Sequence, residues 1–237
     1  MGRTGYSRFF IPPVSIPVLL LILLFLLLVF TLFSGVVLAA FVKLGILPGV
    51  AYTLFILAFI GSFINIPVVE ERTYEPVLTI REVRFMGIPY PVPSFGWAER
   101  KVVVAVNVGG TLVPVGIALY EILRMLYLGQ FTLLLNTLFA VIIAALFSNA
   151  VAKPVRGLGI AMPMFFPPLI AVILGWLLGG INPPAVAYIS GTLGVLIGAD
   201  LMNWGKIKNL GAPMVSIGGA GTFDGVFLAG VIAVLLV

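Results

Sequence analysis

Two aspartates, Asp200 and Asp224, stand inside apolar stretches of the chain and are the residues best suited to chemistry. Both belong to the segment Ile197–Gly225, on either side of a short turn that carries Lys206 and Lys208. An ionised carboxylate at the centre of a membrane costs about 2.5–3.5 kcal/mol on insertion scales. We therefore expect both carboxylates to face a cavity, a partner or a bound cation, and we take Ile197–Gly225 as the expected functional segment.

Neutral oxygen atoms nearby could complete a cation site around the two aspartates. Asn203 follows Asp200 by three residues, which places both side chains on one face of a helix. Asn107 and Thr222 are further candidate ligands. The chain has no Cys and no His, so any metal must be held by oxygen. Oxygen ligands favour a divalent cation such as Mg²⁺, Ca²⁺ or Mn²⁺, bound or transported, and no organic cofactor is expected.

Each of these residues also has a purely structural interpretation. Asp224 could cap the helix that follows it. Asp200 could be a carboxylate at the membrane interface, next to the lysines of the turn. Asn107 could form a hydrogen bond between helices rather than bind a ligand. Glu121 and Arg124, at helical spacing, are typical of a surface ion pair at the end of a helix.

The composition predicts an integral protein of the cell membrane, with the lipid bilayer as its main partner. Of 237 residues, 62% are hydrophobic and only 9% are charged, and the mean hydropathy is +1.25. A soluble domain has about 25% charged residues, so it does not account for this chain. The net charge of +5 is scattered over short loops instead of forming a stripe, which argues against a nucleic-acid partner.

Seven apolar stretches are long enough for membrane-spanning helices, each of which needs about 20 residues. They predict an all-α polytopic protein with a single membrane domain, residues 1–237. The predicted spans are 17–41, 49–66, 102–122, 131–148, 160–179, 185–204 and 213–237.

The loop 67–101, between the second and third stretches, combines acidic and basic residues with a possible hairpin. Val77–Phe85 is β-branched and partly alternating, and three prolines follow it. This pattern predicts a small β-hairpin or extended flap that lies on the cytoplasmic face of the membrane. With seven spans, eleven of the 13 Lys and Arg residues fall on the side of the N-terminus. The N-terminus is therefore predicted to be cytoplasmic and the C-terminus extracellular.

Two parts of the chain share short sequence motifs in the same order. Gly45–Pro48 is similar to Gly180–Pro183, and Val106–Gly110 is similar to Val215–Gly219. We interpret residues 17–122 and 160–237 as parallel repeats, joined by the linker helix 131–148, with helices broken at their glycines. Chance similarity among apolar helices is the alternative interpretation.

The segment Gly198–Leu201 (GADL), followed by Gly218–Leu228 (GGAGTFDGVFL), resembles a prokaryotic, archaeal family of membrane proteins of unknown function. This resemblance implies a polytopic fold and little about activity. Gly198–Leu201 is also weakly similar to the Gly-x-Gly-Asp element of intramembrane aspartyl proteases, although Ala199 stands where that element has glycine.

Three functions follow from these patterns. The first is a cation channel or transporter with an acidic site in the membrane. The second is an intramembrane aspartyl protease in which Asp200 and Asp224 act as acid and base on a shared water. The third is a structural or lipid-handling membrane protein. An enzyme is the less favoured interpretation, and a homo-oligomer is compatible with all three.

Overall fold

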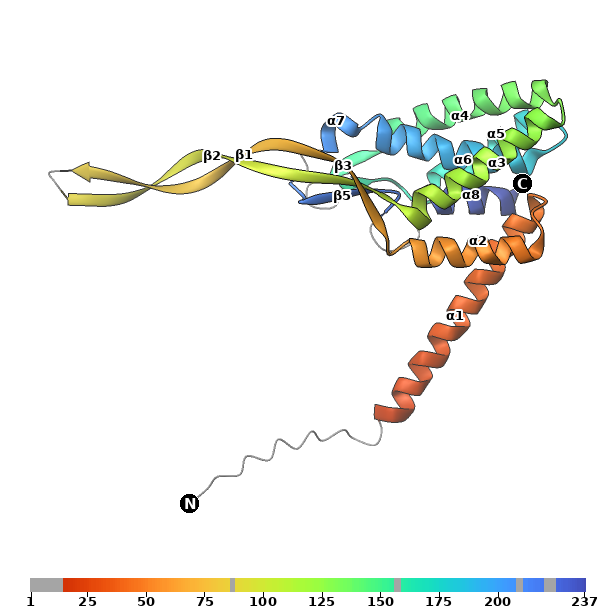
Figure 1. Ribbon diagram of the computed structural model, residues 1–237, viewed down its shortest axis with the longest axis horizontal. Coiled ribbons are helices and arrows are strands. Elements are labelled where there is room, and N and C mark those ends of the chain that lie inside the picture. The colour runs from red at the N-terminus through yellow and green to blue at the C-terminus, as the bar shows by residue number, and fades with distance from the viewer. Residues whose placement is uncertain (1–14, 86–87, 156–158, 208–210, 220–224) are drawn as a thin grey trace, which may run out of the picture.

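The computed structural model describes residues 15–85, 88–155, 159–207, 211–219 and 225–237 (Figure 1). The α-helices are α1 (Ser15–Lys43), α2 (Pro48–Gly61), α3 (Val113–Tyr127), α4 (Phe131–Val151), α5 (Phe166–Leu178), α6 (Pro183–Val195), α7 (Trp204–Ile207) and α8 (Gly225–Leu236). Two π-helical turns, η1 (Val108–Leu112) and η2 (Leu196–Leu201), join β2 to α3 and extend α6. The strands are β1 (Asn65–Phe85), β2 (Ile88–Asn107), β3 (Lys153–Val155), β4 (Gly159–Ala161) and β5 (Met214–Ile217).

Four helical segments of the described chain are long and apolar enough to cross a membrane: Ile16–Lys43, Val108–Tyr127, Phe131–Val151 and Pro183–Lys206. The other three apolar helices, α2, α5 and α8, have 14, 13 and 12 residues. At 1.5 Å per residue they are about 18–21 Å long, which is less than the roughly 30 Å of a hydrocarbon core. Seven full spans and the internal repeat therefore stay predictions.

The prediction of an all-α fold is wrong, because long strands accompany the helices. β1 and β2, of 21 and 20 residues, form an antiparallel hairpin, and β5 pairs in parallel with the base of β2. Residues 102–107, predicted as the start of a spanning helix, are the last residues of β2, and 214–217 form β5. Both segments are short, β-branched and apolar, and periodicity does not separate a buried strand from a buried helix in such a run.

The predicted hairpin is confirmed, but it is longer than the loop 67–101 and does not lie flat against the bundle. It extends from Asn65 to Asn107 and continues beyond the helices, along the long axis of the molecule (Figure 1). Its register shifts once, between Pro67 and Val69. Among the described strands, only β5 joins it in a sheet, from Val103 to Val106 of β2.

The central helix is α6, which packs against α3, α4, α5 and α8. All its residues from Ala185 to Thr192 are buried. Glycines let α4 approach closely: a Cβ at Gly194 would lie 2.5 Å from the Cβ of Ala144, and one at Gly198 would overlap the carbonyl oxygen of Ala145. The helix that leads to Asp200 is therefore held on all sides.

The first helix joins the bundle only through its C-terminal part. Val37, Ala40 and Phe41 are fully buried, and the ring of Phe41 lies 6.3 Å from that of Phe227 in α8. The N-terminal part is exposed and diverges from the other helices (Figure 1). The candidate site is thus built by the remaining helices and the base of the hairpin.

Candidate functional site

Asp200 lies in η2, the π-helical turn that follows α6. π-Helical turns inside α-helices are rare and occur frequently at functional sites. The Asp200 side chain is partly buried, and its neighbour Ala199 is only 3% exposed. Ala199 belongs to a buried apolar cluster with Val226 and Ala229 of α8. The structure therefore connects the turn that carries Asp200 with the first turn of α8.

α6–η2 and α8 run antiparallel, as the order of their contacts shows. Tyr188 and Gly191 of α6 lie close to Gly230 and Ala229 of α8. Further along the chain, Ala199 shares a buried cluster with Val226, so residue numbers rise along α6–η2 while they fall along α8. Asp224 precedes α8 directly in the sequence, and it lies, like Thr222, outside the described residues. The shared site of Asp200 and Asp224 stays a prediction. The structure brings together the helix ends next to them in sequence.

Asn203 is almost fully buried and stabilises η2. Its Nδ2 donates to the carbonyl oxygens of Ala199 at 2.9 Å and Gly198 at 3.3 Å. Its Oδ1 accepts a hydrogen bond from Lys206 Nζ at 2.8 Å. From α4, Asn149 Nδ2 also donates to the carbonyl oxygen of Gly198, at 3.0 Å. Asn203 thus fixes the backbone beside Asp200 and holds a lysine ammonium near the same turn.

Asn107 belongs to a second polar cluster, where β2 leads into η1. It is fully buried, and its Oδ1 accepts from the Gly110 N–H at 2.7 Å, which caps η1. Its Nδ2 donates to the carbonyl oxygen of Ser62 at 2.7 Å and to Asn65 Oδ1 at 3.1 Å. These bonds give Asn107 a structural role, as in the alternative interpretation of this residue.

The two glycine breaks predicted from the sequence are in direct contact. A Cβ at Gly110 would overlap the carbonyl oxygen of Gly218, and one at Gly218 would overlap Thr111 Oγ1. Gly218 has a φ of +77°, which favours glycine. Thr111 Oγ1 donates to the carbonyl oxygen of Ile217 at 2.8 Å. The irregular backbone before α3 and after β5 is therefore buried in protein, the condition for such backbone inside a membrane.

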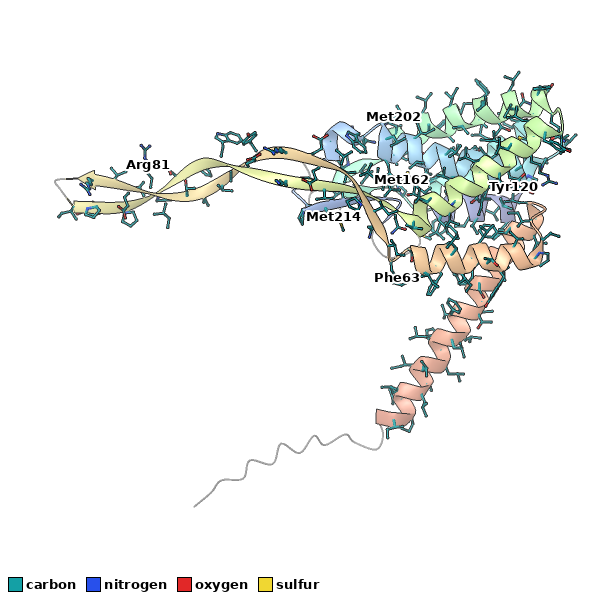
Figure 2. All side chains as sticks on the ribbon, in the orientation of Figure 1. Phe63, Arg81, Tyr120, Met162, Met202 and Met214 are labelled. Carbon is teal, nitrogen blue, oxygen red and sulfur yellow. The ribbon has the colours of Figure 1, made fainter. Side chains whose placement is uncertain are left out.

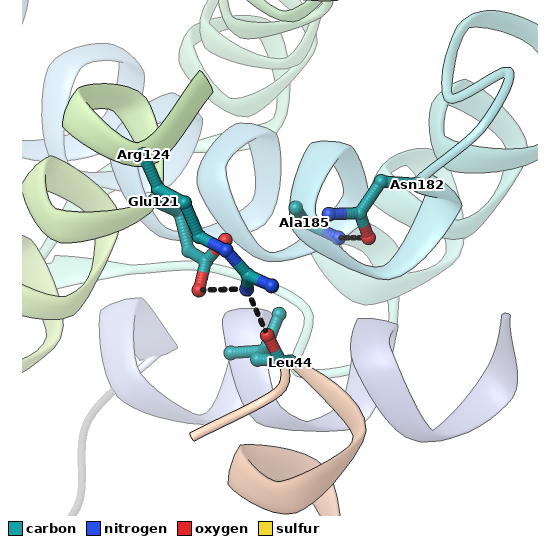
Figure 3. Close-up of polar contacts among 5 residues, drawn as sticks. All are labelled: Leu44, Glu121, Arg124, Asn182 and Ala185. Carbon is teal, nitrogen blue, oxygen red and sulfur yellow. Dashed lines mark hydrogen bonds and ion pairs between the residues drawn. The ribbon is translucent and has the colours of Figure 1, made fainter. Parts of the chain in front are cut away.

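Glu121 of α3 is buried, so its interpretation as one half of a surface pair is wrong. Its side chain is 1% exposed, and its Oε1 lies 3.6 Å from Arg124 Nη1. Arg124 Nη1 instead donates to the carbonyl oxygen of Leu44 at 3.0 Å (Figure 3). Within the part of the chain that the structure describes, neither carboxylate oxygen of Glu121 accepts a hydrogen bond.

The sequence does contain a signal for this burial. The buried residues of α3 include Pro114, Ile117, Glu121 and Met125, which follow one another at spacings of three, four and four. Position 121 therefore lies on the apolar face of the helix. The pair opens onto a small cavity of about 130 Å³, at the end of the bundle opposite the hairpin; Asn182, the N-cap of α6, also lines it.

A larger and apolar cavity, of about 620 Å³, lies between α2 and α3. Its walls include Val50, Leu54, Leu57 and Ile117, and Gly116 lines it with open space at its Cα. Its volume is within the 300–1,000 Å³ range of ordinary ligand sites. The lining suits a hydrocarbon chain better than an ion.

Chemically, the described residues offer one carboxylate at η2 together with carbonyl and amide oxygens. They contain no group of three or more His, Cys, Asp or Glu side chains that could hold a metal. The predicted divalent site combines Asp200 with Asp224, which lies outside the described residues. With only Asp200, the turn would offer a single negative charge.

A family model described as "Protein of unknown function (DUF1614)" matches residues 59–236. The chain therefore belongs to this family, in agreement with the resemblance to membrane proteins of unknown function. No curated protein and no solved structure matches the chain.

Proposed function

We propose that this member of the DUF1614 family is a multi-pass membrane protein that binds a divalent cation at Asp200 and Asp224 and conducts or transports it. The N-terminus is cytoplasmic and the C-terminus extracellular in this proposal. The observation that supports it best is that Ala199 of η2 and Val226 of α8 belong to one buried apolar cluster. Each of these residues is within two positions of one of the acids.

The chemistry of the site favours a cation over the other ligands of a membrane protein. A carboxylate inside an apolar segment is stabilised by a positive partner, and two carboxylates attract a divalent ion more strongly than a monovalent one. Asn203 fixes the backbone of η2 beside Asp200, because its Nδ2 donates to the carbonyl oxygens of Gly198 and Ala199.

Binding is tested with the full chain in lipid nanodiscs, by calorimetry with Ca²⁺ and by electron paramagnetic resonance with Mn²⁺. We expect Asp200→Asn and Asp224→Asn each to weaken binding at least about tenfold, which corresponds to about 1.4 kcal/mol. Glu99→Gln, on the exposed hairpin, is the control and should bind like the wild type. Unchanged affinity in both aspartate variants, or no binding by the wild type, would refute the proposal.

The same protein in liposomes tests passage across the membrane. We expect Mn²⁺ entry to quench an internal metal-sensitive dye, and both asparagine variants to slow the quenching. An aspartyl protease would behave differently: without divalent binding, the wild type would cleave a fluorogenic membrane-helix peptide, and either asparagine variant would lose that cleavage. That result would replace the cation function with the protease.

The apolar cavity supports a second candidate, a lipid-handling role. We propose that an acyl chain occupies the space between α2 and α3. Gly116→Phe should fill this space and reduce the lipid that stays bound in native mass spectrometry, without changing cation binding. Gly35→Phe is the matched control, because a side chain at Gly35 also meets open space but lies on α1, away from the cavity. Equal lipid retention in both variants would exclude this role.

A further inference from the structure

One face of the hairpin's outer part is strongly apolar. Side chains alternate between the faces of a strand, so directly paired residues share a face. Leu78 pairs with Phe95 and Ile80 with Pro93, and Trp97 comes next on the same face. The exposed fractions of Leu78, Ile80, Phe95 and Trp97 are 73%, 76%, 81% and 74%. We call this the aromatic face and define it by Tyr74, Leu78, Ile80, Pro93, Phe95 and Trp97.

The opposite face at the same level is small and polar. Thr79 and Ser94 pair directly and share hydrogen bonds, with 3.2 Å between their hydroxyl oxygens. Gly96 and Arg81 lie on this second face, and Figure 2 shows Arg81 far out on the hairpin. At this level the apolar surface is one-sided, whereas nearer the tip the second face also carries Val83, Tyr90 and Val92, which are 42–49% exposed.

The prolines of β2 prevent a further strand from joining its outer edge. Val103 N–H donates to the carbonyl oxygen of Pro213, away from β1, so the odd-numbered residues of β2 direct their N–H groups outward. Pro89, Pro91 and Pro93 occupy such positions and have no N–H. Because proline blunts this edge of β2, a partner on this side of the hairpin would cover the face instead.

With the helices spanning the membrane along their long axis, the bilayer would not reach this face. The hairpin continues the long axis of the helical bundle, and β2 alone, with 20 residues at about 3.3 Å each, is about 66 Å long (Figures 1 and 2). If the helices cross the membrane along that axis, the outer hairpin stands away from the bilayer, in water. Contiguous apolar patches of more than a few hundred Å² in water are typical of protein interaction sites.

We infer that the aromatic face packs against the same face of a second copy of this chain. Copies in one membrane present their hairpins on the same side and in the same direction. A twofold axis parallel to the hairpins then places β1 of one copy over β2 of the other. Leu78 would contact Phe95 of the partner subunit, and Ile80 would contact Pro93 of the partner subunit. At both of these levels an aliphatic side chain would thus pack against a ring.

The surface is large enough for a stable dimer. A buried aromatic side chain removes about 150–250 Å² from water, so Tyr74, Phe95 and Trp97 supply about 450–750 Å² per copy. Leu78 and Ile80 bring the total to about the 800 Å² per partner of a standard interface. This inference needs the helices to span the membrane and is independent of cation binding, so the two proposals can fail separately.

Cysteine cross-linking tests the arrangement, because the natural chain has no Cys. Leu78→Cys and Phe95→Cys chains are expressed together in one membrane and treated with a short bis-maleimide reagent, and we expect a cross-linked dimer of the two, because facing sheets lie about 10 Å apart and a direct disulfide would not reach. Thr79→Cys with Ser94→Cys is the matched control, because these residues are paired at the same level of the opposite face. We expect no dimer from this control.

The mass of the protein in nanodiscs gives a second and independent measurement. We expect the wild type to be a dimer. Phe95→Ser should raise the dissociation constant of the dimer at least about tenfold, and Tyr90→Ser, on the opposite face, should leave it unchanged. A monomeric wild type, or cross-linking of the control pair as strong as that of Leu78→Cys with Phe95→Cys, would overturn the inference. Quenching of a fluorophore at position 95 by spin-labelled lipid would overturn it too, since the membrane would then be the cover.

Discussion

Replacing Arg124 by methionine tests how much stability depends on the cation beside a buried carboxylate. Glu121 is 1% exposed, and its Oε1 lies 3.6 Å from Arg124 Nη1. With an effective dielectric constant of about 20, two unit charges at this distance attract each other by about 4–5 kcal/mol. Removing one partner of a fully buried pair typically costs about 3–5 kcal/mol, because the other charge stays buried without compensation. Arg124 is itself 38% exposed, so solvent screens part of the attraction, and we expect Arg124→Met to lower the free energy of unfolding by about 2–3 kcal/mol.

A double-mutant cycle separates this effect from the hydrogen bond that Arg124 donates to Leu44. Glu121→Gln removes the charge and keeps the shape, so Arg124→Met should cost much less in that background. The cycle is compared with one on Arg72 and Glu99, which are only 3.1 Å apart but have side-chain exposures of 69% and 44%. Exposed pairs contribute about 0–1 kcal/mol, so the shorter ion pair should show the smaller coupling.

The assay is reversible unfolding in mixed micelles by increasing SDS, followed by circular dichroism. The reasoning would be refuted if Arg124→Met destabilised the protein no more than Arg72→Met. It would also be refuted if Arg124→Met lowered the free energy of unfolding equally in the wild-type and Glu121→Gln backgrounds, since the charge of Glu121 would then not matter.

Two substitutions at the base of the hairpin test the same structure by the same unfolding assay. Gly218→Ala should cost about 2 kcal/mol or more, because φ is +77° and the new Cβ would overlap Thr111, whereas Gly205→Ala, which meets open space, should change stability by less than about 1 kcal/mol. A small loss for Gly218→Ala would contradict the glycine contact. Asn107→Ala should cost about 2–4 kcal/mol, because it leaves the Gly110 N–H and a backbone carbonyl buried without their 2.7 Å partner. A loss below about 1 kcal/mol would show that water replaces the side chain there.

The hairpin shows where prediction from the sequence ends. The alternation in Val77–Phe85 and the prolines after it were sufficient to predict two strands in this region. The last part of β2, Val102–Asn107, was assigned to a helix, because an apolar β-branched run fits both. It pairs with Asn65–Glu71 of β1 on one side and, from Val103 to Val106, with Met214–Ile217 on the other, more than 100 residues later; these pairings make it a strand.

The roles of two asparagines also could not be read from the sequence alone, and one glutamate was assigned to the wrong environment. The sequence marked Asn107 and Asn203 as possible ligands, since an amide oxygen can bind a cation as well as an N–H group. In the structure Asn107 caps η1 and Asn203 holds η2, because backbone groups left unpaired by these turns lie within reach. Glu121 was assigned to the surface, although its spacing from Ile117 and Met125 indicated the buried face.

The sequence by itself determined the environment of this protein: 62% hydrophobic residues, 9% charged residues and long apolar runs predict a membrane protein, because burial in lipid depends on composition along a local stretch. It also determined the acidic candidates and the presence of a hairpin. The tertiary structure alone decided which apolar runs are strands and that η2 and the start of α8 share one buried apolar cluster. These features depend on contacts between segments far apart in the chain, and no local pattern of residues specifies the partner.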